Sequence, residues 1–184
     1  MTIPILVTGA PGNVGTPLVR ELLGLGATVR VAARDIESAR TTFGGVVDVV
    51  HFDFHDPTTF SAFDGIDRMF LLRPPTIADV DRVIGPALDA ARDRGVRSAV
   101  FLSIQGADRN RLVPHRAIEK HLQQTDWRWT FIRAAYFMQN PSTTHAPGLR
   151  DRHELAAPAR RGPQTAPAQP RPRAPAGAEP RRPR

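Results

Sequence analysis

The chain has 184 residues, of which 41% are hydrophobic and 23% charged, and its net charge is +7. This length is sufficient for one core of ordinary size, so we expect a single domain, with or without a tail. The composition is typical of a globular protein and excludes fibrous and fully disordered classes. Because the chain has no cysteine, disulfide frameworks, thiolate metal sites and cysteine nucleophiles are excluded.

The positive charge is concentrated near the end of the sequence. Residues 151–184 contain eight arginines and three acidic residues, a net charge of +5, which leaves +2 for residues 1–150. Aromatic side chains do not interleave with these arginines, so we expect no nucleic-acid partner. No apolar run approaches the roughly 20 residues of a membrane span, and no basic segment precedes the first apolar residues. We therefore expect no membrane partner and a cytoplasmic location.

Short runs rich in Val, Ile, Leu and Phe alternate with segments of helical spacing. The runs predict strands at 3–8, 28–33, 46–52, 67–72, 97–103 and 128–133. The segments between them predict helices at 13–24, 57–63, 77–94 and 114–125, with only a short turn at 35–43. This alternation predicts an α/β fold with a doubly wound, mostly parallel sheet and helices on both faces.

Local signals refine this prediction at three points. Asn13 is a candidate N-cap for the first helix. Asp56 followed by Pro57 predicts a cap and a first helical position. In the last predicted strand, we expect Trp129 and Phe131 to be buried in the core.

The alternating pattern stops after Asn140. Residues 141–184 contain no Val, Ile, Phe, Trp or Tyr, and eight prolines fall between Pro158 and Pro183. Such a segment cannot bury enough apolar area to offset the entropy lost on ordering. We therefore expect a folded domain over 1–145 and a disordered tail, rich in Pro, Arg and Ala, over 146–184.

Three glycines, Gly9, Gly12 and Gly15, stand between the first strand and the first helix. The first permits a tight turn, the second lets the backbone approach a pyrophosphate, and the third lets the helix pack closely on the sheet. The phosphates would meet free N–H groups of this loop, including those of Asn13 and Val14, at the positive end of the helix dipole. The spacing and its context predict a dinucleotide site.

Five motifs, in order, carry a resemblance to a known family. They are ILVTGAPGNVG, VRVAARD, FLSIQGAD, HRAIEKHL and WTFIRAAYFMQN. Residues 3–145 resemble the NmrA-like branch of the atypical short-chain dehydrogenase/reductase superfamily, which includes NAD(P)H-binding regulators and quinone-reductase-like members. The resemblance implies an NAD(P)-binding Rossmann fold and a nicotinamide dinucleotide as ligand.

The residues after the second strand bear on which dinucleotide is bound. A carboxylate there suits the ribose of NAD, and an arginine suits the 2′-phosphate of NADP. Arg34 and Asp35 stand side by side, so spacing alone leaves both open. The resemblance places Ala33 at the acidic position of NAD-preferring relatives and Arg34 at the phosphate-contacting position, which favours NADP(H) over NAD(H). The alternative for Arg34 is a solvated side chain at a strand end.

Further cofactor contacts are expected beyond the carboxyl ends of the other strands, where ligands of open α/β sheets lie. Asp53 and Phe54 would flank the adenine. The ribose and nicotinamide side would be bordered by Leu72, Arg73, Pro74 and Ser103. Ordinary loop or capping roles are the alternatives for Asp53 and Arg73.

The sequence lacks the acid/base pair of typical short-chain dehydrogenases, a tyrosine four residues before a lysine. The single tyrosine, Tyr136, follows the single lysine, Lys120. If Lys120 occupies the lysine position, Arg116 stands in the tyrosine position and cannot serve as acid or base. His115 is a candidate for a proton shuttle, and Lys120 is a candidate for a ribose contact. A surface position is the alternative for both, and the remaining histidines show no metal-ligand spacing.

Two functions remain open. The first is an NADPH-dependent oxidoreductase with a small-molecule acceptor such as a quinone, because hydride can pass directly from a nicotinamide to a quinone without a tyrosine. The alternative is a non-catalytic NADP(H)-sensing regulator that acts through a protein partner. Members of the family continue past residue 145 with a lobe that shapes the substrate pocket. Because the end of this chain is almost wholly Ala, Arg, Pro, Gly and Gln, we expect a truncated or frameshifted product without that pocket.

Overall fold

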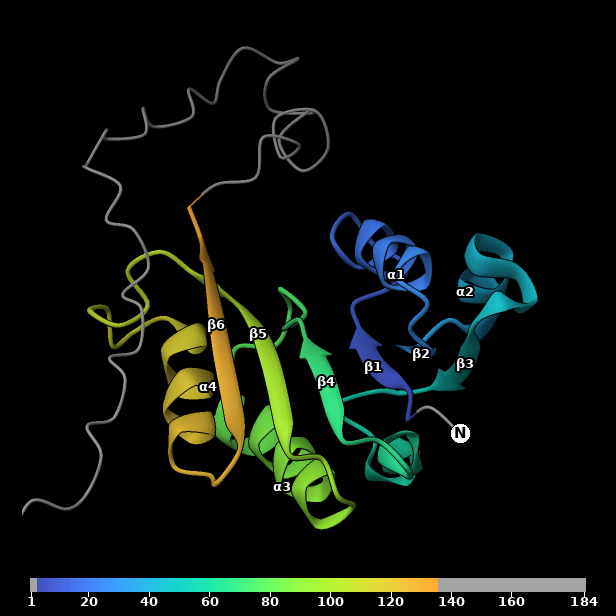
Figure 1. Ribbon diagram of the computed structural model, residues 1–184. Coiled ribbons are helices and arrows are strands. Elements are labelled where there is room, and N and C mark those ends of the chain that lie inside the picture. The colour runs from blue at the N-terminus through green and yellow to red at the C-terminus, as the bar shows by residue number, and fades with distance from the viewer. Residues whose placement is uncertain (1–2, 136–184) are drawn as a thin grey trace, which may run out of the picture. The chain divides into compact units, whose positions relative to one another are not determined.

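The computed structural model describes residues 3–135, and its six strands form one parallel sheet in the order β3-β2-β1-β4-β5-β6 (Figure 1). The strands are β1 (Ile5–Thr8), β2 (Val29–Ala33), β3 (Asp48–His51), β4 (Arg68–Leu71), β5 (Ser98–Ile104) and β6 (Arg128–Ala134). This confirms the doubly wound α/β fold, since the chain runs outward from β1 to β3 and then from β4 to β6 in the opposite direction. Tyr136 and the predicted tail at 146–184 lie outside the described residues.

Helices cover both faces of the sheet (Figure 1). They are α1 (Gly15–Gly24), α2 (Ile36–Phe43), α3 (Gly85–Asp93) and α4 (Pro114–Gln123), with short helical segments η1 (Gly44–Val46), η2 (Pro57–Phe63) and η3 (Val80–Ile84). Within residues 3–135, no helix is both long enough and apolar enough to cross a bilayer.

Successive strand residues face two separate cores. Leu6 packs in the core beneath α3 and α4, and its neighbour Val7 packs in the core beneath α1 and α2. Met69 and Phe70 of β4 divide in the same way. Because both faces of these central strands are buried, their sequences are continuously apolar rather than alternating.

Three predicted local features are wrong. Residues 36–43 form a helix rather than a short turn, because the Asp35 carboxylate accepts a hydrogen bond from the Ser38 N–H at 2.9 Å and Phe43 is buried against the sheet. Asn13 does not cap α1, which has Val14 at its N-cap and no side-chain cap. The helix predicted from residue 77 begins at Val80 instead. The cap at Asp56 is confirmed, since its carboxylate accepts from the Thr58 N–H.

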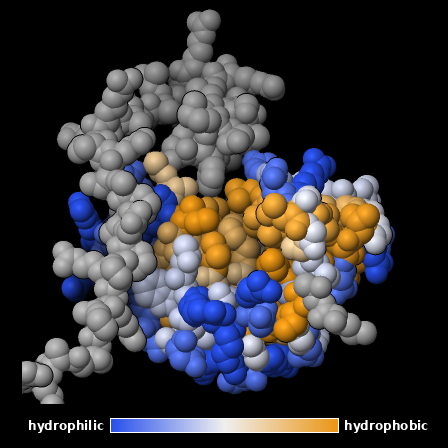
Figure 2. All heavy atoms as spheres, viewed as in Figure 1, coloured by the Kyte–Doolittle hydropathy of each residue, from blue (hydrophilic) through white to orange (hydrophobic). Residues whose placement is uncertain are grey.

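The edge strand β6 is more exposed than the sequence indicated. Trp129 is 41% exposed, contrary to the prediction, and stacks on the partly buried Phe131 with ring centroids 4.6 Å apart. On the other face of the sheet, Ile132 is 48% exposed beside the partly buried Leu102. Figure 2 shows apolar surface gathered on the viewed side of the molecule. An edge strand has a neighbour on one side only, so its apolar side chains are half covered.

Candidate cofactor site

The site lies at the carboxyl edge of the sheet, where β1 and β4 are neighbours but lead to opposite halves. The buried hydroxyl of Thr8 joins the two strands: it accepts from the Leu72 N–H at 2.8 Å and donates to the Phe70 carbonyl at 3.2 Å. Open α/β sheets bind ligands at such a switch point.

A cavity of about 420 Å³ opens at this edge, within the roughly 300–1,000 Å³ range of ligand pockets. Residues at and after the carboxyl ends of four strands line it: Thr8, Gly9, Ala10, Pro11, Ala32, Ala33, Arg34, Asp35, Ser38, Phe52, Asp53, Phe54, His55, Leu72, Pro74, Pro75, Thr76 and Ile77. The cavity thus brings together six residues predicted from the sequence: Gly9, Arg34, Asp53, Phe54, Leu72 and Pro74.

The glycine loop is closed so tightly that side chains do not fit. Gly9 has a φ of +76°, which side-chain-bearing residues rarely adopt, and a Cβ there would lie 2.8 Å from the Leu72 side chain. A Cβ on Gly15 would lie 2.5 Å from the Gly9 carbonyl oxygen, and one on Gly12 would lie 2.7 Å from the same atom. The glycine spacing is therefore required by the loop's own packing as well as by any ligand.

The loop presents unused donors at the start of α1. The Gly12 N–H donates to the Thr16 hydroxyl at 3.2 Å, whereas the N–H groups of Asn13, Val14 and Gly15 make no hydrogen bond within residues 3–135. These donors coincide with the positive end of the ten-residue helix. The arrangement fits a phosphate or pyrophosphate group.

Arg34 and Asp35 both line the cavity but differ in their hydrogen bonding. The Asp35 carboxylate is used as the N-cap of α2. Arg34 is exposed, and its guanidinium forms neither a hydrogen bond nor an ion pair with any other described residue. Ala33, before it, is 5% exposed and carries no charge. Of these two side chains, the one with no partner among residues 3–135 is therefore a cation, which suits an anionic ligand group.

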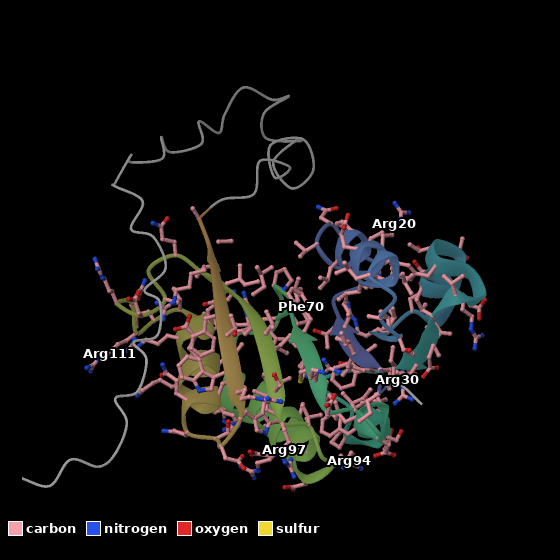
Figure 3. The ribbon with its side chains drawn as sticks, in the orientation of Figure 1. Arg20, Arg30, Phe70, Arg94, Arg97 and Arg111 are labelled. Atoms are coloured by element: carbon pink, nitrogen blue, oxygen red, sulfur yellow. The ribbon has the colours of Figure 1, made fainter. Side chains whose placement is uncertain are left out.

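Two other arginines, Arg94 and Arg97, are engaged elsewhere in the structure. Arg97 and Arg94 lie at the amino ends of the strands, opposite the cavity (Figure 3). Arg97 donates to the carbonyls of Arg92 and Val96, and Arg94 pairs with Asp64 at 3.1 Å.

Asp53 and Phe54 form the wall after β3. The Asp53 carboxylate accepts from the His55 N–H at 2.9 Å, and the backbone N–H of Asp53 donates to the Thr59 hydroxyl at 3.1 Å. Phe54 is 6% exposed and meets Phe52 edge to face at 4.8 Å. This wall offers an aromatic surface and a carboxylate held in a fixed position.

Arg73 does not line the cavity. Its Nη1 donates to the carbonyls of Pro74, Pro75 and Ile77 at 3.0, 3.1 and 2.5 Å, which holds the loop after β4 in place. Its Nε is enclosed without a partner, and burial lowers the pKa of the guanidinium. The role visible in the structure is thus organisation of the loop that lines the cavity.

A buried polar network, which the sequence reading missed, lies beside Ser103. The Ser103 hydroxyl donates to Glu119 at 2.6 Å, and Arg133 binds the same carboxylate through Nε at 3.0 Å and Nη2 at 2.8 Å. Glu119 is 3% exposed, and its hydrogen bond with Arg133 raises the pKa of that guanidinium. The network ties α4 to β5 and β6. A signal was available, because Glu119 stands between Ile118 and Leu122 on the apolar face of the helix.

The network also shows which face of α4 is turned inward. Lys120 is exposed and does not line the cavity, and Arg116 donates to the carbonyls of Ala107 and Asp108 in the preceding loop. The inward-facing pair with a spacing of four is instead His115 and Glu119. Arg116 and Lys120, the pair considered for the tyrosine and lysine positions, therefore each stand one residue after the residues of α4 that pack on the sheet.

His115 begins this face. Its ring stacks on Phe101 with centroids 5.9 Å apart, and Nδ1 is enclosed without a hydrogen-bond partner. Burial and then the charge of Arg73 lower the pKa of the imidazole, and Glu119 opposes them. His115 is thus a half-buried residue rather than the surface residue that was its alternative. Among residues 3–135, no group of His, Asp and Glu side chains could hold a metal ion.

Comparison with known proteins agrees with this geometry. A family model described as NAD(P)H-binding matches residues 9–160. The chain is 33% identical over 140 residues to the prestalk A differentiation protein A of Dictyostelium discoideum, covering 74% of this chain and 46% of that protein. It is 28% identical over 164 residues to the NAD(P)H azoreductase of Xenophilus azovorans, covering 84% and 55%.

Two solved structures share the fold. The triphenylmethane reductase of Citrobacter sp., complexed with NADP(H), has a TM-score of 0.68 at 24% identity, over 81% of this chain and 55% of that chain. The NADPH-dependent quinone oxidoreductase of Escherichia coli has a TM-score of 0.70 at 21% identity, over 80% and 54%. The chain spans about half the length of these proteins. Because the family model matches more than half of the chain, the chain belongs to the NAD(P)H-binding family.

Proposed function

We propose that the chain binds NADPH in preference to NADH and serves hydride transfer from it to a quinone or a similar aromatic acceptor. The observation that carries the cofactor preference is the Arg34 guanidinium at the cavity wall, which has no partner among residues 3–135 and lies beside an aspartate that caps a helix. A guanidinium binds the 2′-phosphate of NADPH through charge-assisted hydrogen bonds, and NADH has no group to use it.

A different group of residues would contact each part of the dinucleotide. The amides of Asn13, Val14 and Gly15 would take the pyrophosphate, and Phe54 with Asp53 would border the adenine. Leu72 and Pro74 would border the nicotinamide half.

The expected reaction needs no tyrosine. The reduced nicotinamide supplies a hydride, and a quinone that receives this hydride together with one proton from solvent becomes the hydroquinone. The names of two relatives, a quinone oxidoreductase and an azoreductase, support an aromatic acceptor. The contribution of this chain is to bind and orient the cofactor at the carboxyl edge of the sheet.

Two measurements on the purified chain test the proposal. Calorimetric titration is expected to show NADPH binding at least tenfold tighter than NADH, a difference of about 1.4 kcal/mol. NADPH consumption is then followed with a panel of benzoquinones, naphthoquinones and a triphenylmethane dye. Equal affinity for both dinucleotides would overturn the cofactor preference. Tight NADPH binding with no consumption across the panel would overturn the enzymatic function and favour the sensing regulator.

A further inference from the structure

The hydrogen bonding of Arg73 is the strongest feature that the proposed function does not use. Its Nη1 donates to three carbonyls of the segment after β4, those of Pro74, Pro75 and Ile77. Its Nε is enclosed, so the guanidinium is packed within the structure rather than extended into solvent. Residues 74–77 (the 74–77 loop) line the cofactor cavity, whereas Arg73 does not. A side chain outside the cavity thus holds one of the cavity's walls.

The 74–77 loop has few hydrogen bonds of its own. Pro74 and Pro75 have no N–H group. The Ile77 N–H donates to the Pro74 carbonyl at 3.1 Å, and this is the only backbone hydrogen bond within the loop. The three bonds from Arg73, at 3.0, 3.1 and 2.5 Å, are therefore the larger part of what fixes the loop's backbone.

Both ends of the loop are anchored independently of Arg73. Leu72 donates its N–H to the Thr8 hydroxyl at 2.8 Å, and its side chain lies against Gly9. Ile77 is buried in the core beneath α3 and α4. Loss of the Arg73 side chain is therefore expected to loosen the loop between two fixed ends and to leave the sheet and the core in place.

The direction of the three carbonyls also suits an anionic ligand. A carbonyl oxygen carries the negative end of the peptide dipole. These oxygens are directed toward Arg73, which does not line the cavity, and the guanidinium charge compensates them there. A dinucleotide carries negative charge on its pyrophosphate, and carbonyl oxygens turned toward that charge would repel it.

We propose that Arg73 is a positioning residue for the dinucleotide, which fixes the 74–77 loop as a wall of the cavity before the ligand arrives. This role rests on the proposed binding of a dinucleotide, but on neither the preference for NADPH nor hydride transfer. A preformed wall avoids the entropy cost of ordering a loop on binding. Because the hydrogen bonds of Arg73 all go to this loop, its effect is expected to be equal for NADPH and NADH.

Hydrogen exchange of the Ile77 amide is measured first, by NMR on the unliganded wild-type chain. We expect this amide to exchange at least about tenfold more slowly than an unstructured amide, because the loop is already formed. In Arg73→Met, which keeps an unbranched apolar stem and removes the donors, we expect exchange at least about tenfold faster than in the wild type. An Ile77 amide that is unprotected in the free wild-type chain overturns the proposal, and this result does not depend on whether any dinucleotide binds.

Dinucleotide affinity is measured second, by calorimetric titration with NADPH and with NADH. Arg73→Met is expected to weaken the binding of both by the same factor, at least about tenfold. Arg97→Met is the matched control, because Arg97 donates to the carbonyls of Arg92 and Val96 at 2.6 and 2.8 Å, at the opposite edge of the sheet. Its affinity for both dinucleotides should stay within about threefold of the wild type.

A conservative variant separates positioning from a general loss of stability. All three carbonyls bind the same nitrogen of Arg73, and a lysine ammonium also has three donors on one nitrogen. Arg73→Lys is therefore expected to recover most of the affinity that Arg73→Met loses and to restore slow exchange at Ile77.

Three results of the titrations overturn the proposal: wild-type affinity in Arg73→Met, an equal loss in Arg97→Met, or a loss confined to NADPH. If the wild-type chain binds neither dinucleotide, the proposed function fails, and the exchange rates alone decide whether Arg73 holds the loop. If Arg73→Met does not fold, exchange in the free wild-type chain and the affinity of Arg73→Lys decide instead, and a Lys variant with wild-type exchange but without dinucleotide binding contradicts the positioning role.

Discussion

Arg34 and Asp35 are adjacent in the chain, but the structure separates their roles: the Asp35 carboxylate caps α2 through the Ser38 N–H, while the Arg34 guanidinium at the cavity wall is unpaired among the described residues. The sequence alone does not indicate which of these two neighbouring charged side chains would contact a cofactor. In the structure, one oxygen of the Asp35 carboxylate is held by the helix N-terminus, and this difference between the two side chains supports the proposed preference for NADPH.

Replacing Arg34 with glutamine is expected to weaken NADPH binding at least tenfold, about 1.4 kcal/mol, and to leave NADH binding unchanged. The 2′-phosphate loses its charge-assisted partner, and NADH has no such group. Calorimetry with both dinucleotides measures the effect, and the exposed Arg82→Gln is the matched control. A parallel loss for NADH would mean that Arg34 acts on the fold or on a group that both cofactors share.

Gly15→Ala is expected to destabilise the fold by about 1–3 kcal/mol and to reduce dinucleotide binding, because the new Cβ would lie 2.5 Å from the Gly9 carbonyl oxygen. Urea denaturation followed by circular dichroism measures the first effect. Gly24→Ala, at the other end of the same helix, is the control: nothing lies within 4 Å of its Cβ position, so stability should change by less than about 1 kcal/mol. Equal behaviour of the two variants would contradict the close packing of the loop.

Glu119→Gln is expected to lower the free energy of unfolding by about 1–3 kcal/mol, because the buried carboxylate accepts from the Ser103 hydroxyl and from Nε and Nη2 of Arg133, and a neutral amide has one oxygen for these three donors. Glu37→Gln breaks an exposed pair with Arg40 and should change stability by no more than about 0.5 kcal/mol. The urea midpoints of the two variants, each compared with the wild type, measure the stability that each carboxylate contributes. A neutral Glu119→Gln would show that the network does not stabilise α4 against the sheet.

The pH dependence of stability is expected to include a contribution from His115. Burial, followed by the charge of Arg73, lowers the pKa of this residue from its ordinary value of 6.5. Between the folded and unfolded pKa values the unfolded chain binds more protons, so the free energy of unfolding decreases as pH falls from 6.5 through the folded pKa. His115→Phe should flatten this part of the urea-midpoint profile, and the exposed His51→Gln should not.

A second pH effect is expected at lower pH. The Thr58 hydroxyl and then the Thr58 N–H hold the pKa of Asp56 below its ordinary value of 3.8. A lowered carboxylate pKa contributes stability above the unfolded pKa, which is lost as pH falls through the folded pKa. Asp56→Asn should therefore show a shallower loss of stability below about pH 4 than the wild type. An unchanged acid limb in urea denaturation would refute this contribution.

The sequence by itself determined the alternation of strands and helices, the parallel sheet and the position of the glycine loop. These features depend on local information: runs of apolar residues for strands buried on both faces, and glycines where backbone approaches backbone. They placed Gly9, Arg34, Asp53, Phe54, Leu72 and Pro74 after their strands, and the cavity lies there.

The tertiary structure alone decided which side chains face the site. A shift of one residue around a helix changes its inward face, and packing against β5 and β6 showed that α4 turns His115 and Glu119 inward instead of Arg116 and Lys120. The direction of Arg73 and the exposure of Trp129 were undetermined for the same reason. Contacts between segments far apart in the chain set these orientations, and among them the local pattern indicated only the inward position of Glu119, between Ile118 and Leu122.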